Sequence, residues 1–147
     1  MVKFEEILGS IVTRLRDTIP GIKVQSQNIE EGFSRPSFFV ELDNIKINDF
    51  MKKLQERKMT VRIVYFPTDK KKNQLELLRM MDSLNVCFVE NNKIDIGDYT
   101  TTEVSGVDIE KTDDVLHYDF EINLSEYYTR EITAEIMQEL NILQEVD

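Results

Sequence analysis

The feature that most constrains this chain is a strict two-residue alternation in the segments 58–66 and 116–124. Successive side chains of a β-strand point to opposite faces, so this period predicts two strands. In the first strand, one face carries Met59, Val61, Ile63 and Tyr65, and the other carries Thr60, Arg62, Val64 and Phe66. In the second, the outward face carries His117, Asp119, Glu121 and Asn123, and the inward face carries Leu116, Tyr118, Phe120, Ile122 and Leu124.

Three segments have the three- and four-residue spacing of amphipathic helices. The first carries the stripe Phe4, Ile7, Leu8, Ile11, Val12 and Leu15 and ends before Pro20, which cannot continue a helix. The second runs from about 71 to 84 behind a cap at Thr68 or Asp69, with the stripe Leu75, Leu78, Met81 and Asn85 and with Leu77 and Leu84 beside it. The third begins behind Thr129 or Thr133 and carries Ile132, Ile136, Leu140 and Leu143.

The remaining apolar segments predict further strands, at 22–27, 37–42 and 94–96, with 86–89 as a buried strand or packing segment. Segment 100–110 is rich in β-forming residues, and a change of alternation near Ser105 and Gly106 predicts a bulge. We expect this segment to pair with 116–124 as a hairpin. Together the elements predict one α+β domain over residues 1–147, with a mainly antiparallel sheet flanked by an N-terminal, a central and a C-terminal helix.

The segment between residues 47 and 57 has two interpretations. Phe50, Met51 and Leu54 have helical spacing behind a cap at Asn48 or Asp49. The alternative, which we favour, is the outer part of a long hairpin with a basic tip of Lys52, Lys53, Arg57 and Lys58. Such a tip on an acidic protein is suited to docking a partner, although lysines also block unwanted pairing at a sheet edge.

Composition argues against several classes of function. The 147 residues carry a formal net charge of -10, which disfavours binding to a phosphate backbone. Because there is one cysteine and one histidine, a Cys/His zinc site and an internal disulfide are both excluded. Cys87 lies among apolar residues and His117 lies on a polar strand face, so neither is expected to be catalytic. We therefore predict that the chain is not an enzyme and uses no metal or cofactor.

The distribution of apolar residues also bears on location. No run approaches the roughly 18 apolar residues that a membrane-spanning helix needs, so no membrane partner is expected. The N-terminus has two acidic residues where a signal peptide has a basic flank and an apolar core. We expect that the protein is made and kept in a reducing cytoplasm, or in a particle assembled there.

Two short motifs resemble those of a known family. Segment 29–40 reads IEEGFSRPSFFV and resembles a pattern in small tail proteins of phages of Gram-positive hosts, where an acidic residue, a glycine and an aromatic precede Pro-x-Phe and an apolar strand. Segment 61–67 reads VRIVYFP and resembles a strand of the same proteins that ends in Tyr-Phe-Pro. With its length, its helix after this strand and its closing hairpin, the whole chain is similar to the phage tail terminator family. It departs from the pattern at 44–56, where such proteins often carry a basic-aromatic hairpin.

The resemblance implies a structural role without chemistry. Tail terminators cap the growing tail tube, end its polymerisation and join it to the neck or connector, and related ones form hexameric rings around a channel for DNA. The implied partners are further copies of the chain, the tail tube protein, a sheath protein and the neck or connector protein, with DNA only as passing cargo. The implied location is the tail of a virion or of a phage-tail-like particle.

Candidate contact residues follow from these expectations. Those for contact with a sister subunit or the tube are Phe33, Arg35, Pro36, Phe50, Met51, Lys52, Lys53 and Leu54. Those for an acidic channel lining are Asp113, Asp114, Asp119 and Glu121. An acidic wall suits DNA that must slide past without sticking. The open alternatives are that Phe33 belongs to the core and that the acidic residues form an outer, solvated face.

Two other functions are kept as alternatives. One is a head-completion or neck protein of the same particle, which is also small, acidic and ring-forming. The other is a cytoplasmic adaptor that captures a peptide along a sheet edge. A metal-dependent hydrolase needs carboxylates that converge in a pocket, and their spread over turns and one strand face disfavours it.

Overall fold

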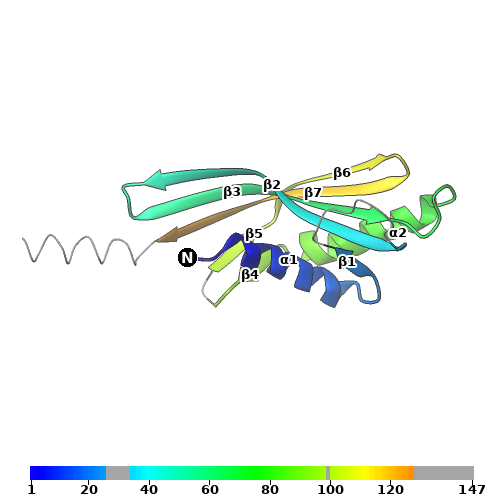
Figure 1. Cartoon of the computed structure of the whole chain (residues 1–147), viewed down its shortest axis with the longest axis horizontal. Coiled ribbons are helices and arrows are strands. Elements are labelled where there is room, and N and C mark those ends of the chain that lie inside the picture. The colour runs from blue at the N-terminus through cyan, green and yellow to red at the C-terminus, as the bar shows by residue number, and fades with distance from the viewer. Residues whose placement is uncertain (26–33, 99, 128–147) are drawn as a thin grey trace, which may run out of the picture.

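A five-stranded sheet dominates the structure, a computed structural model that describes residues 1–25, 34–98 and 100–127. The strand order is β1-β2-β3-β7-β6 (Figure 1). The strands are β1 Lys23–Gln25, β2 Ser37–Phe50, β3 Leu54–Phe66, β6 Ser105–Thr112 and β7 Val115–Tyr127. β1 pairs with β2 in parallel, and the other neighbouring pairs are antiparallel. A second, two-stranded sheet pairs β4 (Lys93–Ile96) with β5 (Thr100–Glu103).

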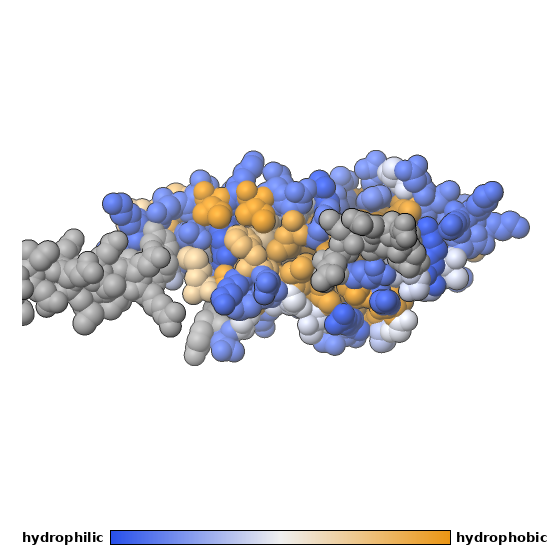
Figure 2. Space-filling model, in the orientation of Figure 1, coloured by the Kyte–Doolittle hydropathy of each residue, from blue (hydrophilic) through white to orange (hydrophobic). Residues whose placement is uncertain are grey.

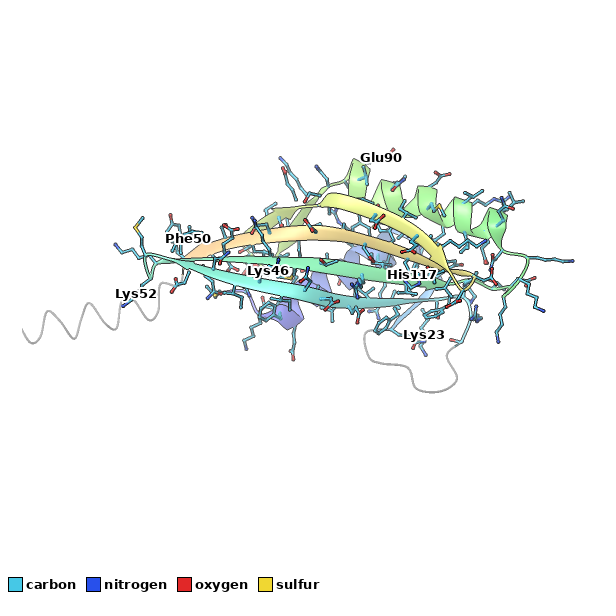
Figure 3. The ribbon with its side chains drawn as sticks, turned by 90° about the horizontal axis from the view of Figure 1, so that it is seen from above. Lys23, Lys46, Phe50, Lys52, Glu90 and His117 are labelled. Carbon is cyan, nitrogen blue, oxygen red and sulfur yellow. The ribbon has the colours of Figure 1, made fainter. Side chains whose placement is uncertain are left out.

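Helices cover one face of the large sheet. α1 (Phe4–Thr18) contacts β2 and β4, and α2 (Gln74–Asn85) contacts β7. A π-helical turn, η1 (Val86–Glu90), continues α2. Figure 3 views the sheet from above, and no helix of the described residues covers its opposite face. This is the α+β architecture that the sequence predicts, and one solvated face is typical of antiparallel sheets.

The core lies between the sheet and the helices. The inward residues predicted for 116–124 are all buried, and so is the Met59 to Tyr65 face of β3, which confirms both alternations. From α1 the core receives Ile7, Ile11, Val12 and Leu15. Phe88 of η1 packs against β7, with ring centroids 4.8 Å from Phe120 and 6.2 Å from Tyr118. One face of the large sheet therefore shares a single core with α1, α2 and η1.

The hairpin interpretation of residues 47–57 is confirmed. β2 and β3 stay paired as far as Phe50 and Leu54, and the turn between them is closed by a hydrogen bond from the Lys53 N–H to the Phe50 carbonyl oxygen. Figure 1 shows the outer half of this hairpin projecting away from the helices. We name residues 45–56 the arm and the rest of the described chain the body. A register shift between Asp43 and Lys46 marks a bulge at the root of the arm.

The stripe predicted for the central helix is wrong in its orientation. The buried residues of α2 are Leu77, Met80 and Leu84, whereas Leu75 and Leu78 are exposed. Both sets have helical spacing, so the pattern alone does not say which one meets the sheet. The helix also begins later than predicted, because Asp69 accepts hydrogen bonds from the N–H groups of Lys71 and Lys72 in a turn that precedes it.

Two apolar segments divide differently from the prediction. Segment 86–89 is not a strand: in η1, Cys87 and Phe88 are buried while Val86 and Val89 are exposed. Segment 100–110 splits between two sheets, since β5 pairs with β4 and β6 pairs with β7. The predicted bulge is confirmed as a register shift between Ser105 and Asp108, and the predicted hairpin is the β6–β7 pair.

The predicted C-terminal helix lies outside the described residues, so the three-helix arrangement is not confirmed and the described chain contains α1, α2 and η1. Within the described ranges, no helix is both long and apolar enough to cross a membrane.

Candidate functional site

The predicted contact residues fall at opposite ends of the sheet. Phe50 to Leu54 form the tip of the arm, whereas Arg35 and Pro36 precede β2 at the far end of the body. Phe33 lies outside the described residues. Arg35 is engaged within the subunit, since its guanidinium donates to the Pro67 carbonyl oxygen at 3.2 Å. The structure therefore groups the predicted contact residues 50–54 at the arm tip. It places Arg35 and Pro36 at the opposite end of the sheet.

The arm tip is apolar and basic. Phe50, Leu54 and Tyr127 lie side by side across β2, β3 and β7, and the Tyr127 side chain is 70% exposed. Met51 is 91% exposed, and Lys52 is exposed beside it. Figure 3 shows Phe50 and Lys52 together at this end. An exposed apolar cluster next to cations is typical of a contact surface.

Arg57 does not belong to the basic tip, contrary to the prediction. Its side chain is 3% exposed at the root of the arm, where its guanidinium pairs with the Glu126 carboxylate of β7. The same carboxylate accepts a hydrogen bond of 3.0 Å from the Val2 N–H, and the guanidinium carbon lies 5.0 Å from the centroid of the Phe4 ring. The signal was present in the sequence, because Arg57 has the parity of the inward residue Met59. Lys58 has the opposite parity and is exposed on the open face, away from the tip.

A second apolar surface adjoins this root. Ile47 is the register partner of Arg57, and both Ile47 and Ile45 are exposed, as are Phe4 and Met1. Figure 2 shows apolar colour gathered over the root half of the arm and the adjoining body. Helix coverage ends here, so the strand pattern continues past the core and leaves its apolar residues in solvent.

The open face of the body carries an acidic patch. We define it as Glu41, Asp43, Asp108, Asp119 and Glu121, which cross-strand pairing places on neighbouring strands around Arg62. Arg62 lies 2.8 Å from an Asp43 oxygen, with Glu41 at 3.8 Å and Asp119 at 3.9 Å. Five carboxylates against one guanidinium leave this surface strongly negative. Asp108 and Asp119 are directly opposite each other, an arrangement that costs stability.

Asp119 is the most constrained member of the acidic patch. Burial raises the pKa of its carboxyl group above the ordinary value, Arg62 and His117 oppose this shift, and Asp108 and Glu110 add to it. One of its oxygens, Oδ1, is buried without a hydrogen-bond partner. The ionised form is therefore under-stabilised in the isolated subunit, and a further cation near this face would favour it.

An apolar row borders the acidic patch. Phe39 pairs with Val64, which pairs with His117, and all three are half-buried on the open face. This row is two residues, or about 7 Å, along the strands from Glu41 and Arg62. On the other side of the patch, a hollow of about 290 Å³ separates it from the arm and is lined by Lys46, Lys58, Thr60 and Glu121, among others.

The turn between β6 and β7 lies at the far end of the body. Asp113 and Asp114 are exposed there, both with positive φ. The buried Asn73 donates from Nδ2 to the Asp114 carbonyl oxygen at 3.1 Å, and it also donates to the carbonyl oxygen of Asp69. The loop that carries Lys70, Lys71 and Lys72 is therefore held beside this turn. The two groups of acidic residues predicted to line a channel thus differ in their neighbours. Asp113 and Asp114 have lysines beside them, whereas Asp119 and Glu121 lie in the patch around Arg62.

In the described part of the chain, Cys87 and His117 lie on different elements, η1 and β7. Burial raises the pKa of the Cys87 thiol, which is 1% exposed, and this disfavours the reactive thiolate. His117 is half-buried on the open face beside Val64. Within residues 1–25, 34–98 and 100–127, no group of three or more His, Cys, Asp or Glu side chains is arranged to hold a metal.

Comparison with known proteins identifies a family. The family model described as phage tail terminator protein matches residues 6–135. The match spans the arm, the acidic patch and both sheets, so it covers the architecture described above and not a single motif. No curated protein matches the chain.

Proposed function

The chain belongs to the phage tail terminator family, a family of structural tail proteins and not of enzymes, and we propose that it caps the tail tube of a phage or phage-tail-like particle. In this role it ends polymerisation of the tube and presents a surface to the neck or connector. Family membership implies a location in the tail and contact with other tail proteins. The partners we propose are the tail tube protein, a sheath protein where the tail has one, and the neck protein.

The observation that best supports this proposal is the arm. It extends the sheet beyond the helices, and its tip exposes Phe50 and Met51 beside two lysines, with the exposed Tyr127 of β7 next to Leu54. A chain that acts alone in solution gains nothing from such a surface, which exposes apolar area to water and invites association. A capping protein needs one, because it must bind neighbours on several sides.

We further propose that the cap is a ring, with six copies as the family resemblance implies. A ring requires that each copy offers two different surfaces, which meet head to tail and close by rotation. The arm and the body provide surfaces of different shape and charge. The isolated subunit is expected to be monomeric at low concentration and to assemble at the tube end.

The passage of DNA is a separate part of the proposal. Asp113 and Asp114 at the body end, or Asp119 and Glu121 on the open face, are proposed to line the channel and keep DNA from adhering. Replacing the pair that lines the channel by lysine should slow genome ejection while assembly remains intact. Unchanged ejection from both variants would contradict a channel role for these residues.

Deleting the gene tests the capping function. Electron microscopy of the resulting particles should show overlong tails without attached heads, with a broad length distribution, and expression of the intact chain should restore one length. Tails of normal length that lack heads would instead identify a neck or head-completion protein. Normal particles would refute both roles and favour the cytoplasmic adaptor.

A further inference from the structure

We propose that the arm tip of one copy docks, head to tail, on the acidic patch of a second copy. The inference rests on the proposed ring and identifies the contact that builds it. Its starting point is that the open face of the large sheet is basic at the arm tip and acidic on the body. The tip carries Lys52 and Lys53, and the body carries five carboxylates around Arg62.

The two surfaces match in more than charge. At the tip, the apolar row of Phe50, Leu54 and Tyr127 adjoins the lysines. On the body, the apolar row of Phe39 and Val64 adjoins the carboxylates. Each surface therefore offers an apolar strip beside a charged strip, with the charges of opposite sign. Complementary potential with an apolar centre is the usual composition of a specific interface.

The tip cannot reach the acidic patch of its own subunit. Leu54 and Arg62 lie on the same strand and the same face, eight residues apart, which is about 26 Å along β3. A continuous paired sheet does not fold back over that distance. Figure 3 shows the separation, with Phe50 and Lys52 at one end of the strands and His117 near the other. A second copy is the simplest partner, because every copy carries both surfaces.

The tip turn indicates that its side chains are there for contact. Met51 and Lys52 have φ values of 54° and 57°, a conformation that favours Asn-Gly in two-residue hairpin turns. A methionine that is 91% exposed and strained by its backbone contributes nothing to the folded subunit. Its position at the extreme end of the arm suits insertion against the Phe39 and Val64 row of a neighbour.

Docking of this kind leaves one surface free at each end of a pair, so it repeats. The first copy still offers its acidic patch, and the second still offers its arm. The contact therefore builds a chain of copies that ends only when the rotation closes a ring. It also gives Asp119 and Glu121 a partner within the protein shell, and leaves the channel role to Asp113 and Asp114.

Disulfide trapping tests the contact directly. Native Cys87 is buried, so new cysteines report without interference. Met51→Cys labels the tip, and Val64→Cys labels the Phe39 and Val64 row against which Met51 is placed, without altering a charge. Oxidation of the double variant should give a ladder of dimers, trimers and higher species, both for the concentrated pure chain and in lysates in which tails assemble. The absence of a ladder in both samples, or dimers alone, would overturn the proposal.

Matched variants separate docking from random collision. Met51→Cys with Leu78→Cys places the second thiol on the exposed side of α2, and should give no ladder. Adding Lys52→Glu and Lys53→Glu to the reporting pair should lower the cross-linked fraction roughly tenfold, as should 1 M salt. Adding Asp108→Lys and Glu121→Lys to that chain should restore the ladder. A ladder indifferent to both charge changes would contradict the assignment of the surfaces.

Failure of the capping proposal gives a different result. A deletion strain with tails of normal length would refute capping even if the ladder forms. Overlong tails in that strain together with no ladder would keep the capping role and reject this contact. With Asp119→Lys and Glu121→Lys, the proposal expects failed assembly, whereas slowed ejection from fully assembled particles would return these residues to the channel.

Discussion

Arg57 joins the root of the arm to the neighbouring strand through a buried ion pair. Its guanidinium joins β3 to β7 through Glu126, and Glu126 in turn accepts the Val2 N–H ahead of α1. Phe4 covers the guanidinium from the helix side. The N-terminus, the arm and the end of β7 are thus held at one point, where the helices cease to cover the sheet.

Removing one partner of this buried pair should destabilise the fold. Glu126→Ala leaves Arg57 charged and buried, and we expect the free energy of unfolding to fall by about 3 kcal/mol. Urea denaturation measures the change. The control is Glu56→Ala, which removes a 3.5 Å ion pair with the exposed Lys58 and should cost less than about 1 kcal/mol. Equal effects of the two variants would contradict the structural role of Arg57.

Two buried tyrosines predict how the fold responds to alkali. Burial raises the pKa of Tyr65 to about 12, with Glu76 adding to the shift, and burial likewise raises the pKa of Tyr118 to about 12. In the unfolded chain these phenols ionise near pH 10. Their contribution to stability is therefore fully present below pH 10 and is lost as pH rises from 10 to 12.

Absorbance at 295 nm and circular dichroism over pH 9–12.5 check this expectation. Tyr65 and Tyr118 should ionise above pH 10 and together with loss of structure. Replacing both by Phe should make the fall in stability over this range shallower. Ionisation of both tyrosines near pH 10 in a chain that stays folded would show that neither side chain is shielded.

At the scale of elements, η1 divides the apolar residues 86–89 between the core and solvent. Phe88 points into the Tyr118 and Phe120 cluster, and Val89 points to solvent. Arg14 of α1 holds the same segment by donating to the carbonyl oxygens of Cys87 and Lys93. A strand here would have placed alternate residues inside; the π-helical turn buries two consecutive ones.

This sorting predicts unequal effects of truncation. Phe88→Ala should lower the free energy of unfolding by about 3–5 kcal/mol, because it empties the centre of the aromatic cluster. Val89→Ala should change it by less than about 0.5 kcal/mol, since its side chain is exposed. Thermal or urea unfolding compares the two. Similar losses would indicate that segment 86–89 is buried throughout, as the sequence first suggested.

The turn of the arm has a strained backbone that a glycine would relieve. Met51→Gly should raise the free energy of unfolding by about 1 kcal/mol, because its positive φ suits glycine and its exposed side chain packs on nothing within the subunit. Lys53→Gly is the matched control in the same turn, where φ is not positive, and should lower stability by roughly 0.5 kcal/mol. Urea midpoints measure both, and a destabilising Met51→Gly would mean that the turn differs from that described.

On the scale of the whole molecule, folding and docking use different parts of the sheet. The helix-covered half holds the core, and the arm adds strand length without adding buried apolar residues. The solvated face then carries the apolar and basic tip at one end and the acidic patch at the other. Stability and assembly should therefore be separable by mutation.

An armless chain tests that separation. Asn48 and Glu56 are register partners, so replacing residues 49–55 by Asn-Gly closes the hairpin early with a favourable turn. We expect the free energy of unfolding to stay within about 1 kcal/mol of the intact chain, because only exposed or half-buried residues are lost. In a deletion strain the armless chain should fail to restore tail length. Restored tails would show that the arm is dispensable for capping.

Much of this fold follows from local pattern. The alternation at 58–66 and 116–124, the stripe of α1 and the bulge near Ser105 all predicted what the structure contains, because a period of two or of 3.6 residues fixes which side chains share a face. The alternation that places Met59 inside also places Arg57 inside when it is extended by two residues toward the arm. The arm was predicted as a hairpin, although helical spacing at Phe50 and Leu54 left an alternative open.

The sequence by itself determined the buried faces of α1, β3 and β7 and the excess of negative charge. Only the tertiary structure decided which of two apolar stripes on α2 meets the sheet, and where helix coverage ends so that Ile47 remains in solvent. It also gathered Glu41, Asp108 and Asp119 from three strands around Arg62. The reason is physical: periodicity is a property of neighbours along the chain, whereas coverage and charge clustering depend on which distant segments pair.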